Sequence, residues 1–280
     1  MTWADDGTTP QVAIISESLA DQLFPGGNAV GQHMRIEAGT GDTQPGGGGH
    51  GGSQSALGGP IFRFFTRSYV AAASLYLGAV EDALEHTAAI VAEQPTGHWL
   101  KGLPEGNHFA AMALAGRAEA EALIPALLPW LPVAGRRNVE GAYHALETLV
   151  TGLALMDERE RRAGLYSLTL TFIQTGRVHT GLVIGPGSPQ LAAALAADAA
   201  GLVDQSREHF ETALRQAHEV PIRILQPTVL YWYGRALSAA VDAADGARGR
   251  AMVEAALTDF RALEMVLHAN LAERFLREGR

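Results

Sequence analysis

The chain has 280 residues, of which 47% are hydrophobic and 18% charged, and it contains no cysteine. This length and apolar content suffice for a large buried core in one or two domains, and the lack of cysteine excludes disulfides and thiolate zinc sites. The 21 lysine and arginine residues against 30 aspartate and glutamate residues give a formal charge of −9, which disfavours nucleic acid and anionic membrane surfaces as partners.

The first residues, Met1–Asp6, carry neither the basic start nor the apolar stretch of a signal peptide. No later stretch reaches the roughly 18 consecutive apolar residues that a transmembrane helix needs. The apolar stretch from Tyr69 to Val80, for example, ends at Glu81. We therefore expect a cytoplasmic protein without a membrane-spanning segment.

The stretch VAIISESLADQLFPGGNAVGQHMRI, residues 12–36, reads as a strand, a helix, a Pro-Gly-Gly turn and the start of a second strand. It resembles the extracytoplasmic core domain of ABC-exporter permeases of the macrolide- and lipoprotein-exporter type. The matching residues are Val12, Ala13, Ile14, Ile15, Ser16, Glu17, Leu19, Ala20, Phe24, Pro25, Gly26, Gly27, Asn28, Val30, Gly31, Arg35 and Ile36. The resemblance implies that residues 1–38 form a small strand–helix–strand fragment, detached from the rest of that fold.

Residues 39–59 read GTGDTQPGGGGHGGSQSALGG, in which 10 of 21 residues are glycine and Asp42 is the only charged residue. Such a segment buries too little apolar surface to offset the entropy lost on ordering, so we expect a flexible linker and a domain boundary. A phosphate-binding loop is the alternative interpretation of so much glycine. It would require a following Lys-Ser or Lys-Thr pair and a preceding strand, and the sequence has neither.

From Pro60 onward, apolar residues recur at spacings of three and four, as on one face of a helix. Glycine and proline mark the expected helix ends, which are Gly78, Pro95, Gly116, Gly176, Gly201 and Gly246. Two helix starts are indicated by Ser188 followed by Pro189, and by Asp157 with Glu160 three residues later. We expect about ten helices of roughly 12 to 20 residues, joined by short connections.

The predicted helices come in pairs. In YLGAVEDALEHTAAIVAEQP a turn glycine, Gly78, precedes the small residue Ala83. In GLVDQSREHFETALRQAHEVP the turn is Gly201, the bulky packing residue is Phe210 and the small residue is Ala213. Both segments resemble tetratricopeptide repeats, which implies an α-solenoid of stacked antiparallel helix hairpins over residues 60–280. Hairpin turns at Gly78, Gly116, Met156, Gly201 and Gly246 would be spaced 38, 40, 45 and 45 residues apart.

A second resemblance extends from Phe62 to the C-terminus and is strongest between Thr175 and Arg235. The segments IQTGRVHTGLVIG, AGLVDQSREHFETALRQAHEVPIRILQPTVLYWYGRAL and GRAMVEAALTDFRALEM are similar to the C-terminal helical region of bacterial regulators. Those regulators join a class III adenylate/guanylate cyclase or a transcription-factor domain to an AAA-type ATPase and then to tetratricopeptide-like repeats. The motif GxxxxGKS/T is absent from the sequence, so the resemblance implies the C-terminal part of a regulator without its ATPase and cyclase.

No residue pattern indicates catalysis, a metal or a cofactor. The histidines lack ligand spacing on a helix, and the carboxylates Glu119, Glu121, Asp157, Glu158 and Glu160 stand beside arginines, as on a solvated helix face. The segment GPGSP, Gly185–Pro189, could offer backbone N–H groups to an anion, although helix capping explains it equally. We therefore expect no catalytic residue, no metal ligand and no cofactor-binding residue.

The three residues proposed for partner binding are Tyr231, Trp232 and Arg235. Successive helical residues point to different sides, so at least one aromatic ring of Tyr231–Tyr233 should be exposed or meet a neighbouring helix. Core packing is the alternative role for these rings, and a solvated surface charge is the alternative for Arg235. The sequence predicts a non-catalytic module that binds a protein or peptide, and a fragment related to an exporter permease is the other hypothesis.

Overall fold

The computed structural model describes residues 60–93, 100–178, 184, 187–220, 222–239 and 242–278. The chain divides into two units, Met1–Ala56 and Leu57–Arg280, and every described residue belongs to the second. The strand–helix–strand fragment predicted for residues 1–38 and the linker predicted for residues 39–59 lie outside the described residues.

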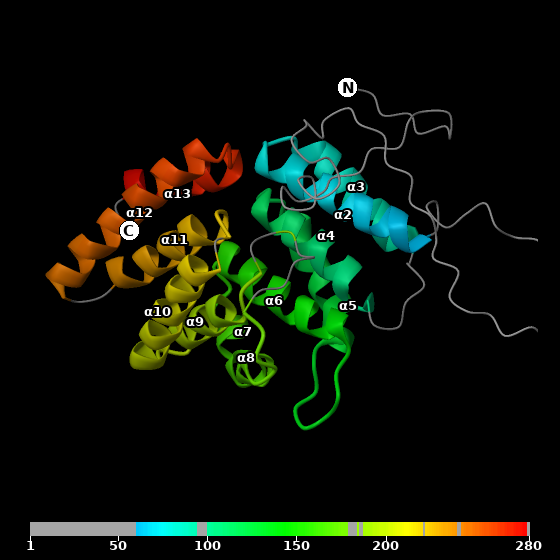
Figure 1. Ribbon diagram of the computed structural model, residues 1–280, viewed down its shortest axis with the longest axis horizontal. Coiled ribbons are helices and arrows are strands. Elements are labelled where there is room, and N and C mark those ends of the chain that lie inside the picture. The colour runs from blue at the N-terminus through cyan, green and yellow to red at the C-terminus, as the bar shows by residue number, and fades with distance from the viewer. Residues whose placement is uncertain are drawn as a thin grey trace, which may run out of the picture. The chain divides into compact units, whose positions relative to one another are not determined.

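The described residues form 12 α-helices, two short 3-10 helices and no strand (Figure 1). The prediction of an all-helical chain beyond Pro60 is confirmed for these residues. None of the described helices is both long enough and apolar enough to span a bilayer. The helices are α2 (Pro60–Tyr76), α3 (Val80–Glu93), α4 (Leu103–Leu114), η2 (Ala118–Leu123), α5 (Ile124–Leu127), η3 (Leu128–Trp130), α6 (Glu140–Leu155), α7 (Arg159–Ala163), α8 (Tyr166–Ile173), α9 (Pro189–Ala199), α10 (Val203–Glu219), α11 (Leu225–Ser238), α12 (Ala243–Ala262) and α13 (Val266–Glu278).

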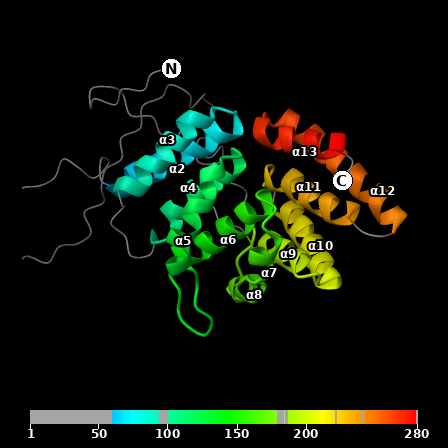
Figure 2. The same cartoon turned by 180° about the vertical axis from the view of Figure 1, so that it is seen from behind.

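The long helices pack mainly against their neighbours in the chain, as the two opposite views in Figures 1 and 2 show. Helix α2 packs on α3, α3 on α4, and α4 on α6. After the short helices α7 and α8, α9 packs on α10, α10 on α11, α11 on α12, and α12 on α13. Helix α6 also contacts α9, which joins the first group of helices to the second.

Local residue chemistry sets several helix ends where the sequence predicts them. Gly78, Gly116, Gly176 and Gly201 have φ between 68° and 81° and follow α2, α4, α8 and α9. Only glycine enters this left-handed region without steric cost, so each residue ends its helix. Helix α9 begins at Pro189, and the Ser188 hydroxyl accepts a hydrogen bond of 3.2 Å from the backbone N–H of Leu191. The predicted helix start at Ser188–Pro189 is confirmed.

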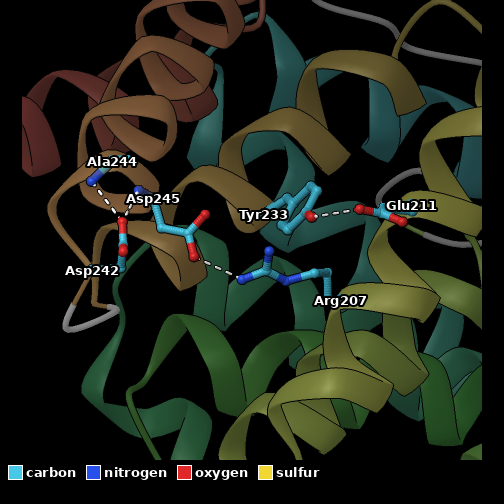
Figure 3. Close-up of polar contacts among 6 residues, drawn as sticks. All are labelled: Arg207, Glu211, Tyr233, Asp242, Ala244 and Asp245. Atoms are coloured by element: carbon cyan, nitrogen blue, oxygen red, sulfur yellow. Dashed lines mark hydrogen bonds and ion pairs between the residues drawn. The ribbon is translucent and has the colours of Figure 1, made fainter.

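The predicted helix end and hairpin turn at Gly246 are wrong. Gly246 lies inside α12, whose cap is Asp242, four residues earlier. The Asp242 carboxylate accepts backbone hydrogen bonds of 2.7 Å from Ala244 and 3.0 Å from Asp245 (Figure 3). An aspartate cap satisfies free N–H groups of the first turn, so the chain turns before Gly246.

The region around Asp157 also differs from the prediction. Helix α6 ends at Leu155, with Met156 as its cap, as expected of a turn there. Asp157, however, has φ of 60°, and the residue that precedes α7 is Glu158. Helices α5, α7 and α8 have only 4, 5 and 8 residues, so the expected length of roughly 12 to 20 residues fails for these three.

The two packing positions predicted for α10, Phe210 and Ala213, lie in the core. Phe210 is 1% exposed, and its ring stacks on that of Tyr233 in α11, with centroids 5.0 Å apart. Ala213 and Ala217 are fully buried on the same face, so α10 presents small residues beside one large ring. This arrangement matches the packing roles predicted for Phe210 and Ala213.

Helix α13 contacts α2, so the first and last described helices of this unit touch. The ring of His268 lies between those of Tyr76 and Phe260, at centroid distances of 5.6 Å and 5.3 Å. His268 is buried, and its Nδ1 has no hydrogen-bond partner among the described residues. Burial disfavours the charged imidazolium and lowers the pKa of His268 to about 4.

We expect this buried histidine to make stability depend on pH. The unfolded chain takes up a proton at His268 near the ordinary histidine pKa of 6.5, whereas the folded chain does so only near a pKa of about 4. The free energy of unfolding therefore falls as the pH falls from the unfolded-state pKa towards the folded-state pKa. The loss is about 2 kcal/mol between pH 7 and pH 5. Urea unfolding of wild type and His268→Leu at pH 7 and pH 5 measures this loss of stability. The variant should lack the part of the pH dependence that His268 causes.

The exposed His218 supplies the control, because His218→Leu should keep the wild-type dependence. An unchanged pH dependence in His268→Leu would contradict the burial of a neutral imidazole at this contact. His108 and His209 also have a pKa lowered by burial, so a smaller dependence of the same sign should remain in His268→Leu.

Candidate functional site

Helix α11 carries the three residues that the sequence proposes for partner binding. It lies among α9, α10 and α12, and this position leaves Tyr231 only 3% and Trp232 only 5% exposed. The Tyr231 ring meets Phe260 of α12 edge-on at 6.3 Å and Trp232 at 5.1 Å. The aromatic rings of α11 therefore meet neighbouring helices instead of solvent, which is one of the two arrangements expected.

Arg235 is half-buried, and its guanidinium lies over aromatic rings on one side. Its Cζ is 5.0 Å from the centroid of the Trp232 ring, 5.8 Å from that of Tyr231 and 5.9 Å from that of Phe275 in α13. Such cation–π contacts fix the direction of the side chain. Burial raises the pKa of Tyr231, and the positive charge of Arg235 acts against that shift. Among the described residues, Arg235 forms no ion pair with a carboxylate.

Arg162 of α7 lies near Arg235. It is only 6% exposed, and its Nη2 is 3.6 Å from the Asp198 carboxylate, which is too long for a hydrogen bond. Its Nε is buried and has no hydrogen-bond partner among the described residues. Burial lowers the pKa of Arg162, Asp198 opposes this, and the charge of Arg235 lowers it further. The two guanidinium groups are therefore close enough to repel each other.

Helix α7 is held in place by Arg159, whose side chain donates to the C-terminal end of α9. Its Nε donates to the Ala199 carbonyl at 3.1 Å and its Nη2 to the Asp198 carbonyl at 2.8 Å. The Asp198 carbonyl also accepts from the backbone N–H of Gly201 at 3.0 Å. The Arg159 bonds place a positive charge at the negative end of the helix dipole. The same contact brings Arg162 towards α11.

Four arginines and three carboxylates contribute to the charge interactions of Arg162 and Tyr231. We call the four arginines linked here by charge interactions the arginine cluster: Arg159, Arg162, Arg235 and Arg274. The acidic groups in the same set of interactions are Asp157, Asp198 and Glu278. Arg274 and Glu278 are exposed on α13, so the cluster extends from the core to the surface.

These positions divide the three predicted binding residues into two roles. Tyr231 and Trp232 have almost no surface for a partner to touch, and they support the guanidinium of Arg235. Arg235 alone of the three has accessible surface. The part of Arg235 in binding stays a prediction, and the structure gives the two rings the packing role.

The sequence did not identify Arg162 as part of this site. The segment from Arg159 to Arg162 reads as a solvated helix face, and the side chain of Arg161 is indeed 49% exposed. The Arg162 side chain is 7% exposed, so the interpretation is wrong for this residue. Nothing in the sequence separates the two adjacent arginines, because contact with α9 decides which one is buried.

A second polar cluster joins α10, α11 and α12 (Figure 3). Arg207 donates to the Asp245 carboxylate at 2.8 Å, and the Tyr233 hydroxyl donates to Glu211 at 3.1 Å. Arg248 lies over the Tyr233 ring, 5.6 Å from its centroid. These contacts hold the three helices together.

A third cluster lies at the start of α6. Glu140 is 3.2 Å from Nε2 of the buried His144 and forms an ion pair with Arg177. These partners, His144 first, lower the pKa of Glu140 to about 2. Within the described ranges, no group of three histidine, aspartate or glutamate residues could hold a metal ion.

Two of the five carboxylates considered for acid–base work, Glu121 and Glu158, form ion pairs with Arg161. Arg161 lies 3.3 Å from Glu121 and 3.7 Å from Glu158, an arrangement typical of solvated helix faces.

No protein-family model, no curated protein and no solved structure matches this chain.

Proposed function

We propose that this chain is a non-catalytic helical-repeat module of a cytoplasmic signalling or transcription regulator, which binds a protein or peptide partner. In this proposal residues 60–280 form a tetratricopeptide-like α-solenoid of stacked antiparallel hairpins. The observation that supports it most is the stacking of Phe210 in α10 on Tyr233 in α11, because repeat proteins pack each unit mainly against the next one.

In this proposal the chain acts by binding and uses no cofactor, since its sequence has no GxxxxGKS/T motif. The exposed carboxylates paired with Arg161 support this role. Within the proposal, Arg235 contacts the partner while Tyr231 and Trp232 hold it in position, since an arginine fixed by aromatic rings is a common source of binding energy. The alternative, a fragment related to an exporter permease, rests on residues 12–36, and no observation on the described residues favours it.

Affinity capture tests this function. The full chain, immobilised, is exposed to cell extract, and bound proteins are cross-linked and quantified for wild type, Arg235→Gln and Arg223→Gln. Arg223 is exposed just before α11, so its substitution removes the same charge away from the arginine cluster. We expect recovery of the specific partner to drop about tenfold or more with Arg235→Gln and to stay unchanged with Arg223→Gln.

Equal recovery by all three proteins would remove Arg235 from the binding surface. The lack of any protein enriched over an unrelated helical control would contradict the proposed module.

A further assay concerns catalysis: calorimetry with ATP and magnesium should give no saturable heat, and no cyclic nucleotide should form. Turnover of ATP would make the chain an enzyme and refute the proposal.

A further inference from the structure

The connection between η3 and α6 carries two positive charges that have no partner within the part of the chain that the structure describes. Residues 122–139 include Arg136 and Arg137 and contain no aspartate or glutamate. Both arginines are exposed, and neither guanidinium forms an ion pair or a hydrogen bond with a described residue. The carboxylates that flank this stretch, Glu121 and Glu140, are paired with other arginines. The connection therefore presents its charge to solvent, in a chain whose formal charge is −9.

The two arginines belong to a loop whose backbone is held by Asn138. Its Oδ1 accepts a hydrogen bond of 2.8 Å from the backbone N–H of Val133, and its Nδ2 donates to the carbonyls of Val133 at 3.0 Å and Arg136 at 3.1 Å. The backbone N–H of Arg136 donates to the Val133 carbonyl at 3.2 Å and closes a β-turn. Gly135, the third residue of this turn, has φ of 74°, as a type II turn requires. We call residues 133–138 the basic loop.

Both ends of the basic loop are anchored on the helices. Before the loop, the ammonium group of Lys101 lies over the Trp130 ring, 5.7 Å from its centroid, and Pro132 is buried. After the loop, Glu140 at the start of α6 forms its ion pair with Arg177. The segment between η3 and α6 projects from the helices in both views (Figures 1 and 2). A loop that is ordered before binding loses little conformational entropy when a partner docks.

We propose that the basic loop is a docking surface for an acidic protein segment in which carboxylates alternate with apolar side chains. Guanidinium groups bind the two oxygens of a carboxylate through parallel N–H donors, and arginine is enriched in protein interfaces. Val133 is 50% exposed and offers an apolar contact on the same loop. Arg235 does not belong to this surface, so the inference goes beyond the proposed function and does not rest on it.

The charge of the chain favours an acidic protein segment over nucleic acid. A formal charge of −9 repels a polyanion at long range, and two arginines neutralise only two of its phosphates. A short acidic segment carries less charge and contacts the loop alone. At physiological ionic strength, salt screens charges more than about 8 Å apart, so the segment meets mainly the local attraction of Arg136 and Arg137.

Fluorescence anisotropy with synthetic peptides tests the basic loop. The full chain is titrated into a labelled peptide of repeated Glu-Glu-Leu units and, separately, into one of repeated Gln-Gln-Leu units. We expect wild type to prefer the glutamate peptide, and the double variant Arg136→Gln with Arg137→Gln to bind it about tenfold more weakly. The matched control is Arg215→Gln with Arg223→Gln, which removes two exposed charges elsewhere and should keep the wild-type affinity.

Asn138→Ala tests the fixed backbone, because it keeps both arginines and removes the side-chain hydrogen bonds that order the loop. We expect it to bind the glutamate peptide about threefold more weakly. Circular dichroism checks that every variant is folded, and unchanged affinity of Asn138→Ala would refute the role of the ordered backbone.

Three results would overturn the docking surface itself. The first is equal affinity of wild type for the glutamate and glutamine peptides, or of wild type and the double variant for the glutamate peptide. The second is a loss in the control as large as in the double variant, which would show general charge attraction. The third is tighter binding of a single-stranded oligonucleotide that the double variant loses, which would assign the loop to phosphate groups.

Discussion

Replacing Trp232 with alanine should lower the free energy of unfolding by about 3 to 5 kcal/mol, the usual loss for a large buried aromatic ring. The ring is 5% exposed and packs edge-on against Tyr231 at 5.1 Å. It also supports the guanidinium of Arg235 at 5.0 Å. Since domains are stable by only about 5 to 15 kcal/mol, the substitution should remove a large share of the stability. Urea unfolding followed by circular dichroism measures it.

Tyr69→Ala provides the control, because this aromatic side chain in α2 is 52% exposed. We expect it to change stability by roughly 0.5 kcal/mol or less. The comparison also separates the two roles considered for Trp232. A variant that stays as stable as Tyr69→Ala but no longer captures a partner would identify Trp232 as a binding residue and contradict its place in the core.

The helix ends that could be predicted from the sequence are those set by neighbouring residues. Gly78, with φ of 81°, ends a helix through its own backbone conformation. The Ser188 hydroxyl starts a helix by accepting a hydrogen bond from the backbone N–H three residues ahead. Both effects reach no further than one turn of the chain. The amphipathic face of α10 could be predicted for the same reason, since Phe210, Ala213 and Ala217 recur at helical spacing. Such short-range sequence patterns set the local structure independently of the rest of the fold.

The features that could not be predicted depend on contacts between distant segments. The adjacent residues Arg161 and Arg162 have the same chemistry, and only the position of α9 makes one exposed and the other buried. Glycine is a residue type that often ends helices, but Asp242 caps α12, so the helix starts before Gly246. The sequence therefore predicted one of the two arginines of the candidate site. Arg235 could be identified because aromatic residues precede it in the sequence, whereas Arg162 reaches the site only through tertiary packing.

A pair of glycines sets the contact between α11 and α12, the most extensive between any two described helices. A Cβ atom on Gly234 would lie 2.6 Å from the backbone oxygen of Gly249. A Cβ atom on Gly249 would lie 2.5 Å from the backbone oxygen of Gly234 and 2.7 Å from the backbone nitrogen of Ser238. All three distances are far below van der Waals contact, and the obstacle is backbone that cannot rotate away. The two helices can therefore approach this closely only without side chains at the crossing.

Gly249→Ala should consequently destabilise the protein by roughly 3 kcal/mol, because α12 must move away from α11 and lose packing around Phe260 and Tyr231. The matched control is Gly246→Ala, one turn earlier in the same helix, where no atom lies within 4 Å of the added Cβ. There alanine should stabilise the helix by about 0.5 to 1 kcal/mol, since glycine loses more backbone entropy on folding. Urea unfolding of both variants should thus give changes of opposite sign. Two stabilising substitutions would mean that α11 and α12 do not cross at Gly234 and Gly249.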